Sequence, residues 1–178
     1  MQDEQIMQTA QMLENSRREM EDKWLTFWMD RQLFGVSIAS VEQIVSMQPI
    51  TVVPDYPAYA KGIINLRGNI IPLIDLRLRL GKQEIEYNDH TCIIINSVED
   101  SQLGFIVDEV DAVTSIPQSD VAPPPQMGED TTNRYLTGVA RIAHDDGTEK
   151  IVLCLNAARV LREDEFNDLC TTSSTQNK

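Results

Sequence analysis

Hydrophobic and polar residues alternate along most of the chain, which is the pattern of β-strands that bury one face. In WLTFWMD (24–30), Leu25, Phe27 and Met29 face one way, and the alternation returns in LFGVSI (33–38). Turn residues separate the strand-like runs, and the pattern predicts about nine or ten short strands in small barrels or a sandwich. Further runs follow at 50–53, 63–66, 70–74, 90–96, 102–110, 112–116, 137–143 and 151–156.

A few segments have helical rather than strand-like spacing. Residues 4–22 carry apolar residues at three- and four-residue intervals without Gly or Pro, so residues 1–23 are predicted to be an N-terminal helical extension. Ser40 can cap a helical turn over SVEQIV, with Val41 and Ile44 inward, and Asp75 can cap LRLRL (76–80). Short helices are also expected at 157–161 and 163–169, and residues 167–178 are assigned to a disordered tail.

The stretch GIINLRGNIIPLIDL (62–76) combines two short apolar runs with a turn between them. Gly68 and its neighbour Asn69 tolerate positive φ, so Arg67-Gly68-Asn69 predicts a hairpin turn. Asn65 and Gly68 are interpreted as turn architecture. Pro72 lacks an N–H group, which favours an edge or bulged position in the second strand.

Composition and charge narrow the possible partners. The formal charge is −13, which argues against a nucleic-acid backbone or an anionic membrane as the main partner. No apolar run approaches the roughly 20 residues of a membrane-spanning helix, and the polar, acidic N-terminus has no secretory pattern. Three widely spaced cysteines indicate reduced thiols in a cytosolic protein.

The charges are also unevenly distributed. Five basic residues and one acid lie between Lys61 and Lys82, whereas residues 83–133 contain acids but neither Lys nor Arg. Two explanations of this asymmetry have equal weight: ordinary solvation of a charged surface, and separate surfaces for different partners.

Residues that could perform catalysis do not come together in the sequence. Gly81-Lys82 lacks the upstream glycine of a phosphate-binding loop, and the two histidines, His90 and His144, lie far apart. The acidic groups at 108–111 and 145–146 match calcium loops poorly, and no His/Cys spacing matches a zinc site. We therefore expect no catalytic residues, no metal and no cofactor, and a protein that binds other proteins.

One long motif resembles the CheW family of bacterial chemotaxis coupling proteins. Tyr56 to Leu76 reads YPAYAKGIINLRGNIIPLIDL, and supporting matches are FGVSIASVEQI, LGFIVDEVDAV, YLTGVARI and LCLNAARVL, in the family's order. The resemblance covers roughly 24–166. It implies two small SH3-like five-stranded β-barrel lobes that share a hydrophobic seam, with the chain crossing between lobes near 82–90.

The resemblance also implies a function. Such proteins are non-catalytic scaffolds that couple the cytoplasmic tips of membrane chemoreceptors to the regulatory domain of the CheA histidine kinase. A receptor helix would lie in a groove between the lobes, an established mode of peptide recognition. By motif, Val41, Glu42 and Ile44 would line that groove with Arg67 at its edge. This chain has Gln43 where a glutamate is common, and Glu42 one place earlier.

Three alternatives remain at this stage. Arg67 could instead fasten backbone carbonyls across its hairpin, a structural role compatible with partner contact. The adaptor could serve a chemosensory pathway that controls pili or second messengers. A small-ligand or nucleotide-binding protein would need a polar pocket and a phosphate loop, and the sequence offers neither.

Overall fold

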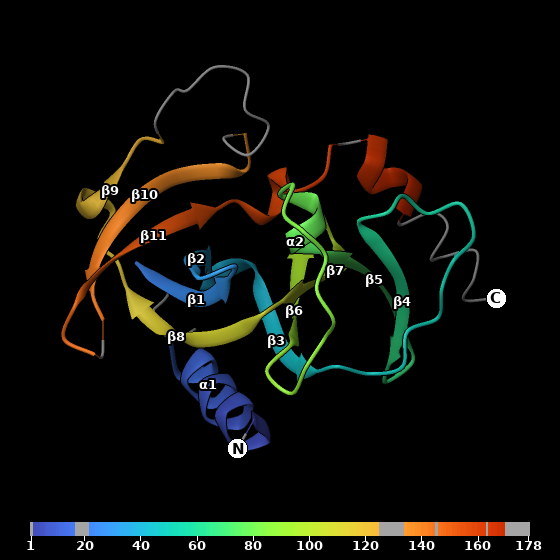
Figure 1. The fold of residues 1–178 in the computed structure, drawn as a ribbon, viewed down its shortest axis with the longest axis horizontal. Helices are drawn as coiled ribbons and strands as arrows, with labels where there is room; N and C mark the ends of the chain where they lie inside the picture. Colours follow the sequence, from blue (N-terminus) through green and yellow to red (C-terminus); the bar gives the residue numbers. More distant parts are fainter. Residues whose placement is uncertain (1, 17–21, 125–133, 145, 163, 170–178) are drawn as a thin grey trace.

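The chain forms two β-sheets that pack against each other with a helix across one side (Figure 1). The computed structural model describes residues 2–16, 22–124, 134–144, 146–162 and 164–169. In spatial order, the six-stranded sheet consists of β8 (Glu109–Ser115), β1 (Lys23–Met29), β2 (Gln32–Ser37), β11 (Glu149–Leu155), β10 (Leu136–Ala143) and β9 (Val121–Ala122). The five-stranded sheet consists of β3 (Val41–Ser46), β6 (Cys92–Val98), β7 (Ser101–Val107), β5 (Asn69–Asp75) and β4 (Ala60–Leu66).

The predicted mostly-β fold with two strand lobes is confirmed, although one sheet has six strands rather than five. The predicted crossover near 82–90 is wrong. The chain leaves the six-stranded sheet through the 3₁₀ turn Ile38–Ser40 and returns at Asp108, between β7 and β8. Residues 82–90 instead form a loop that stays with the five-stranded sheet and leads into β6. Local periodicity identifies strands but not the sheet to which each belongs.

Tight turns connect the two strands of each antiparallel hairpin. The two central turn residues have positive φ in each of three hairpins: Asp30 and Arg31 (52° and 66°), Arg67 and Gly68 (53° and 88°), and Glu99 and Asp100 (49° and 65°). Such turns have a twist that matches the twist of the strands they connect. Asp30, the last residue of the strand-like run 24–30, therefore belongs to the first turn rather than to β1.

The helical turn expected over SVEQIV is wrong, because these residues form strand β3. The register with β6 shifts between Val41 and Gln43, which places a bulge at Glu42. The extra residue puts Val41 and Ile44 on the same buried face although they are three apart. Their spacing therefore imitates a helix. The strand expected at 50–53 is reduced to one bridge, between Thr51 and Ile63.

Pro72 lies in β5, which is an interior strand and not the predicted edge. Pro72 is opposite Ile63 of β4, whose N–H and C=O both bond to Thr51 on the other side. The Pro72 nitrogen therefore points away from β4. On that side the pairing of β5 with β7 begins only at Leu73, so the missing N–H breaks no ladder bond.

Helices cover the ends and one side of the sheets. The N-terminal helix α1 (Gln2–Ser16) is confirmed, as is α2 (Leu76–Arg79), which begins where the Asp75 carboxylate accepts a hydrogen bond from the Leu78 N–H. The predicted 157–161 helix is a 3₁₀ turn over Ala157–Arg159, and a helix follows at 164–169. The disordered tail expected from residue 167 is wrong for 167–169, which belong to this helix, and residues 170–178 lie outside the described residues.

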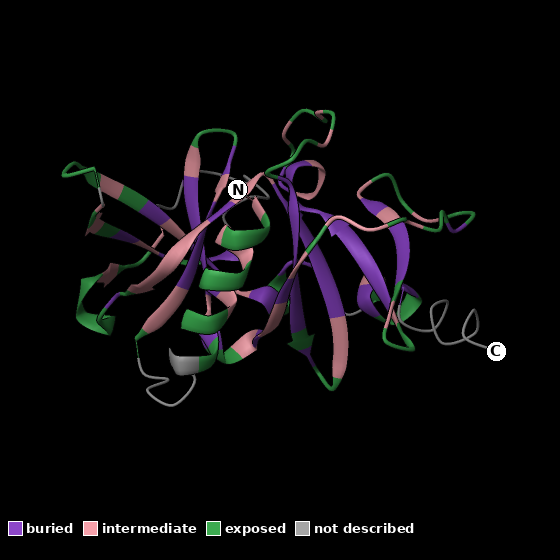
Figure 2. Cartoon of the chain, turned by 90° about the horizontal axis from the view of Figure 1, so that it is seen from below, coloured by how far each residue is buried: buried purple, intermediate pink, exposed green. Residues whose placement is uncertain are grey.

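The largest apolar cluster contains buried residues from both sheets and from the helices that flank them. Figure 2 shows that buried residues occur along the strands of both sheets. Its fully buried members include Phe27 and Phe34 from the six-stranded sheet and Phe105 from the five-stranded one. Phe27 and Phe34 stack with ring centroids 6.1 Å apart. Since both sheets contribute to one core, the two lobes are joined by a shared hydrophobic seam.

Candidate partner-binding surface

Arg67 lies at the exposed tip of the hairpin between β4 and β5. The turn is held from within, because the Asn65 Oδ1 accepts a hydrogen bond of 2.9 Å from the Gly68 N–H. Gly68 has φ of +88°, a conformation that favours glycine. The backbone of the turn is therefore held in place by its own hydrogen bond, and the Arg67 side chain is exposed to solvent.

The structure brings Arg67 and Glu42 to one cleft of about 340 Å³. On the side of the sheet, the cleft is lined by Glu42 and Gln43 of β3 and by Arg67; on the other side lie Ala10, Leu13 and Glu14 of α1. The Glu42 carboxylate also accepts a hydrogen bond of 2.5 Å from the Gln102 side-chain amide. The cleft thus offers both signs of charge together with the apolar side chains of Ala10 and Leu13.

Val41 and Ile44 were expected to line an open groove, and the structure places them elsewhere. Their exposed fractions are 2% and 5%, and both belong to the main apolar cluster. The bulge at Glu42 turns them inward, while Glu42 and Gln43 are partly exposed. In this conformation the polar residues of β3 face the cleft and the apolar ones support it from below.

Most of the basic residues between 61 and 82 pair with carboxylates of the same chain. Lys61 bonds to Glu84, and Lys82 lies 3.7 Å from Asp30. Arg77 and Arg79 pair with Asp108 and Glu165. Of the five basic residues, only Arg67 is exposed. The basic segment therefore stabilises the fold more than it forms a surface, and Arg67 is its outward-facing member.

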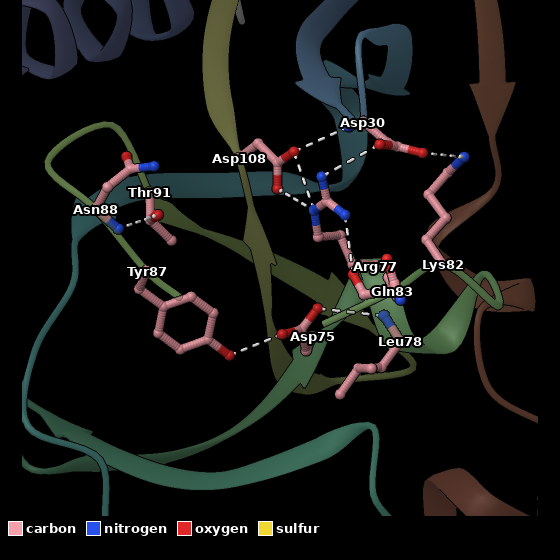
Figure 3. A network of polar contacts seen from close by, with 10 residues as sticks. All are labelled: Asp30, Asp75, Arg77, Leu78, Lys82, Gln83, Tyr87, Asn88, Thr91 and Asp108. Carbon is pink, nitrogen blue, oxygen red and sulfur yellow. Dashed lines mark hydrogen bonds and ion pairs between the residues drawn. The ribbon is translucent and has the colours of Figure 1, made fainter. Parts of the chain in front are cut away.

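The buried Arg77 joins the two sheets through an ion cluster with the partly exposed Asp108 and the exposed Asp30 (Figure 3). Its Nε lies 2.9 and 3.1 Å from the two carboxylate oxygens of Asp108, and its two terminal nitrogens reach the Gln83 carbonyl at 2.9 Å and the Asp30 carboxylate at 3.4 Å. Asp108 also accepts from the Asp30 N–H at 2.9 Å. Although burial alone would lower it, the pKa of Arg77 is raised, because Asp108 and Asp30 favour the charged guanidinium. The cluster ties the β1–β2 turn to α2 at the point where the chain crosses between sheets.

Arg79 anchors the C-terminal helix in a similar way. Its guanidinium donates to both oxygens of Glu165 at 3.0 and 2.6 Å, and Tyr59 donates to the same carboxylate at 2.9 Å. Burial favours the neutral acid, yet the Arg162 N–H, Arg79 and Tyr59 together hold the pKa of Glu165 below its usual value. Burial and the bond to Glu165 raise the pKa of Tyr59 to about 12.

Sequence reasoning did not identify these two arginine clusters. Asp108 is 31 residues from Arg77, and Glu165 is 86 residues from Arg79. The available signal was the alternation LRLRL, in which a short helix cannot expose every arginine. Among the described residues, no helix has the length and apolar character needed to cross a bilayer.

Comparison with known proteins matches the chain to one family. The family described as "CheW-like domain" covers residues 23–165. The chain is 39% identical over 121 residues to the chemotaxis protein CheW of Treponema pallidum, spanning 66% of this chain and 71% of that protein. It is 27% identical to CheW of Klebsiella aerogenes, spanning 81% and 84% of the two chains.

A solved structure agrees. The crystal structure of the scaffolding protein TtCheW from Thermoanaerobacter tengcongensis superposes with a TM-score of 0.72 at 32% identity, covering 82% of this chain and 96% of that one. The family match over residues 23–165 takes in the two-sheet body that carries Glu42, Arg67 and both arginine clusters. The chain belongs to the CheW-like family of chemotaxis scaffold proteins.

Proposed function

We propose that this protein couples the cytoplasmic tips of chemoreceptors to the CheA histidine kinase as a non-catalytic scaffold. The observation that carries the proposal is the family match across the whole two-sheet body. We place the protein on the cytoplasmic side of membrane receptor arrays. Within the chain, we assign residues 24–166 to the scaffold body and residues 1–23 to an N-terminal extension.

The receptor contact is assigned to the cleft beside Arg67. A helix docking there would meet Glu42 and Arg67, which both line the cleft above the buried residues Val41 and Ile44. Charged groups at the rim of an interface guide orientation and association, while apolar groups contribute most of the affinity. Asn65 and Gly68 contribute by fixing the turn and need not touch the partner.

Co-sedimentation with a receptor signalling fragment and with CheA tests the proposal. The wild-type chain is expected to sediment with each partner and to bridge both. Failure to bind either partner would overturn the proposed function.

Arg67→Glu tests the assigned surface, with Arg141→Glu as a matched control because Arg141 is an exposed arginine on β10. We expect Arg67→Glu to weaken receptor binding roughly tenfold, which corresponds to about 1.4 kcal/mol. Its free energy of unfolding should stay within about 0.5 kcal/mol of wild type, since Arg67 is exposed. Equal losses of stability and binding would assign Arg67 the structural role instead.

A further inference from the structure

Helix α1 lies outside the residues that match the family and packs on the face assigned to the receptor. The match begins at residue 23, whereas α1 spans Gln2–Ser16. The helix contacts β3 of one sheet and β8 of the other, and each of these is an edge strand of its sheet. Figures 1 and 2 show α1 lying across both strands, with its exposed residues turned outward.

The helix completes the cleft beside Arg67. Ala10, Leu13 and Glu14 of the helix line it together with Glu42 and Arg67 of the sheet. Leu13 is 2% exposed and belongs to the same apolar cluster as Val41 and Ile44. An amphipathic helix with its apolar side against this face is the same kind of ligand as a receptor helix.

The attachment of α1 is shallow. Among the residues of α1 whose burial the structure describes, only Thr9 and Leu13 are buried, and Ile6 is partly buried. Met7 and Met12 are 70% and 47% exposed. Two glutamines reach the body through neutral hydrogen bonds. Gln5 donates to the Val110 carbonyl of β8 at 3.0 Å, and Gln2 donates to the Thr91 carbonyl at 3.1 Å.

These contacts suit a helix that leaves its site. A 15-residue helix is marginally stable by itself in water, so it depends on its docking contacts for its structure. Two buried residues, the partly buried Ile6 and the two glutamine hydrogen bonds offer the helix much less buried apolar surface than the core offers the strands.

We infer that α1 is an intramolecular competitor of the receptor helix, which occupies the face formed by β3 and β8 and leaves when the receptor binds. This inference rests on the proposed function and adds regulation to it. Only the chain with α1 undocked is competent to bind, so the apparent receptor affinity is proportional to the undocked fraction. A change that weakens α1 docking therefore increases receptor affinity.

The test uses the full-length chain and a receptor signalling fragment. Leu13→Asp places a charge in the buried contact, and Met7→Asp makes the same change at an exposed position of the same helix. We expect Leu13→Asp to tighten receptor binding roughly threefold to tenfold, and Met7→Asp to leave it within about twofold. Gln5→Ala, which removes the bond to Val110 with less risk to folding, should give a smaller gain in the same direction.

Hydrogen exchange gives a second readout. Amides of residues 2–16 should lose protection when the receptor fragment binds, whereas a helix that forms part of the receptor site would gain protection. Weaker or unchanged binding of both Leu13→Asp and Gln5→Ala, with receptor binding intact in the wild type, would overturn the inference alone. Absence of receptor binding in the wild type and every variant would overturn the proposed function and this inference together.

Discussion

Tyr87→Phe removes the hydroxyl group that donates a hydrogen bond to the buried carboxylate of Asp75. The Tyr87 hydroxyl donates a hydrogen bond of 2.7 Å to Asp75 Oδ2, while Asp75 Oδ1 accepts from the Leu78 N–H at 3.3 Å (Figure 3). Asp75 is 1% exposed and begins α2. Burial and the bond to Asp75 raise the pKa of Tyr87, so the hydroxyl remains a donor at neutral pH.

The magnitude follows from the kind of bond lost. A hydrogen bond to a charged group contributes about 1.5–3 kcal/mol, and a buried acceptor that loses its donor keeps its desolvation cost. Tyr87 is only partly buried, so water can replace part of the contact. We therefore expect the free energy of unfolding to fall by about 2 kcal/mol, which lowers Tm by about 4–8 °C in a chain of this size.

Urea denaturation followed by circular dichroism measures the change, and Tyr59→Phe is the matched control. Tyr59 also donates to a carboxylate, but Glu165 keeps two bonds from Arg79 and one from the Arg162 N–H. The control should lose less than about 1 kcal/mol. A double-mutant cycle with Asp75→Asn isolates the coupling between Asp75 and Tyr87. Losses that are equal in the two Tyr→Phe variants, or a Tyr87→Phe loss below about 0.5 kcal/mol, would refute this reasoning.

Three other predictions concern packing, acid stability and thiol reactivity. Gly104→Ala should lower the free energy of unfolding by about 1–3 kcal/mol in urea melts, because the new Cβ would lie 2.5 Å from Leu73 Cδ2; a wild-type melting curve would contradict it. The pKa of Glu165 in the folded chain is below its unfolded value of 4.5, so its contribution to the free energy of unfolding is present above pH 4.5 and disappears as the pH falls below that value. Glu165→Gln should therefore flatten the acid limb of a curve of Tm against pH. An unchanged acid limb would count against the ion pair with Arg79. Burial raises the pKa of Cys92 to about 12 and of Cys154 to about 11, so in a Cys170→Ser background iodoacetamide should label the chain only as fast as it unfolds; rapid labelling in native buffer would disprove this.

Local sequence features were sufficient for most of the strands, for the hairpins and for the cap of α2. Asp75 before LRLRL and the Asn65 to Asn69 turn are short-range patterns, and the chemistry of such turns depends on neighbouring residues. The period-two alternation of Leu25, Phe27 and Met29 likewise needs no tertiary information.

The main errors arise from long-range contacts. The β3 bulge shows its effect only when β6 is alongside, so Val41 and Ile44 read as a helix. The crossover at Asp108 depends on which sheet accepts β8, and the Arg77 cluster joins residues 30, 77 and 108. Arg67 and Glu42 could be selected by family motif, but the wall that α1 adds to their cleft could not, because α1 carries no family motif.

The route of the chain between sheets has a consequence for the order of assembly. All five strands of one sheet come from the continuous stretch 41–107, whereas the other sheet combines 23–37 with 109–155. In the six-stranded sheet, β2 pairs in parallel with β11, and Leu33 lies opposite Val152. This sheet can therefore form only when almost the whole chain is present. During synthesis the inserted sheet is therefore complete first, while the β1–β2 hairpin waits for its partner strand. A chain that stops after β7 would carry one finished sheet and an exposed hairpin edge, which is a template for aggregation.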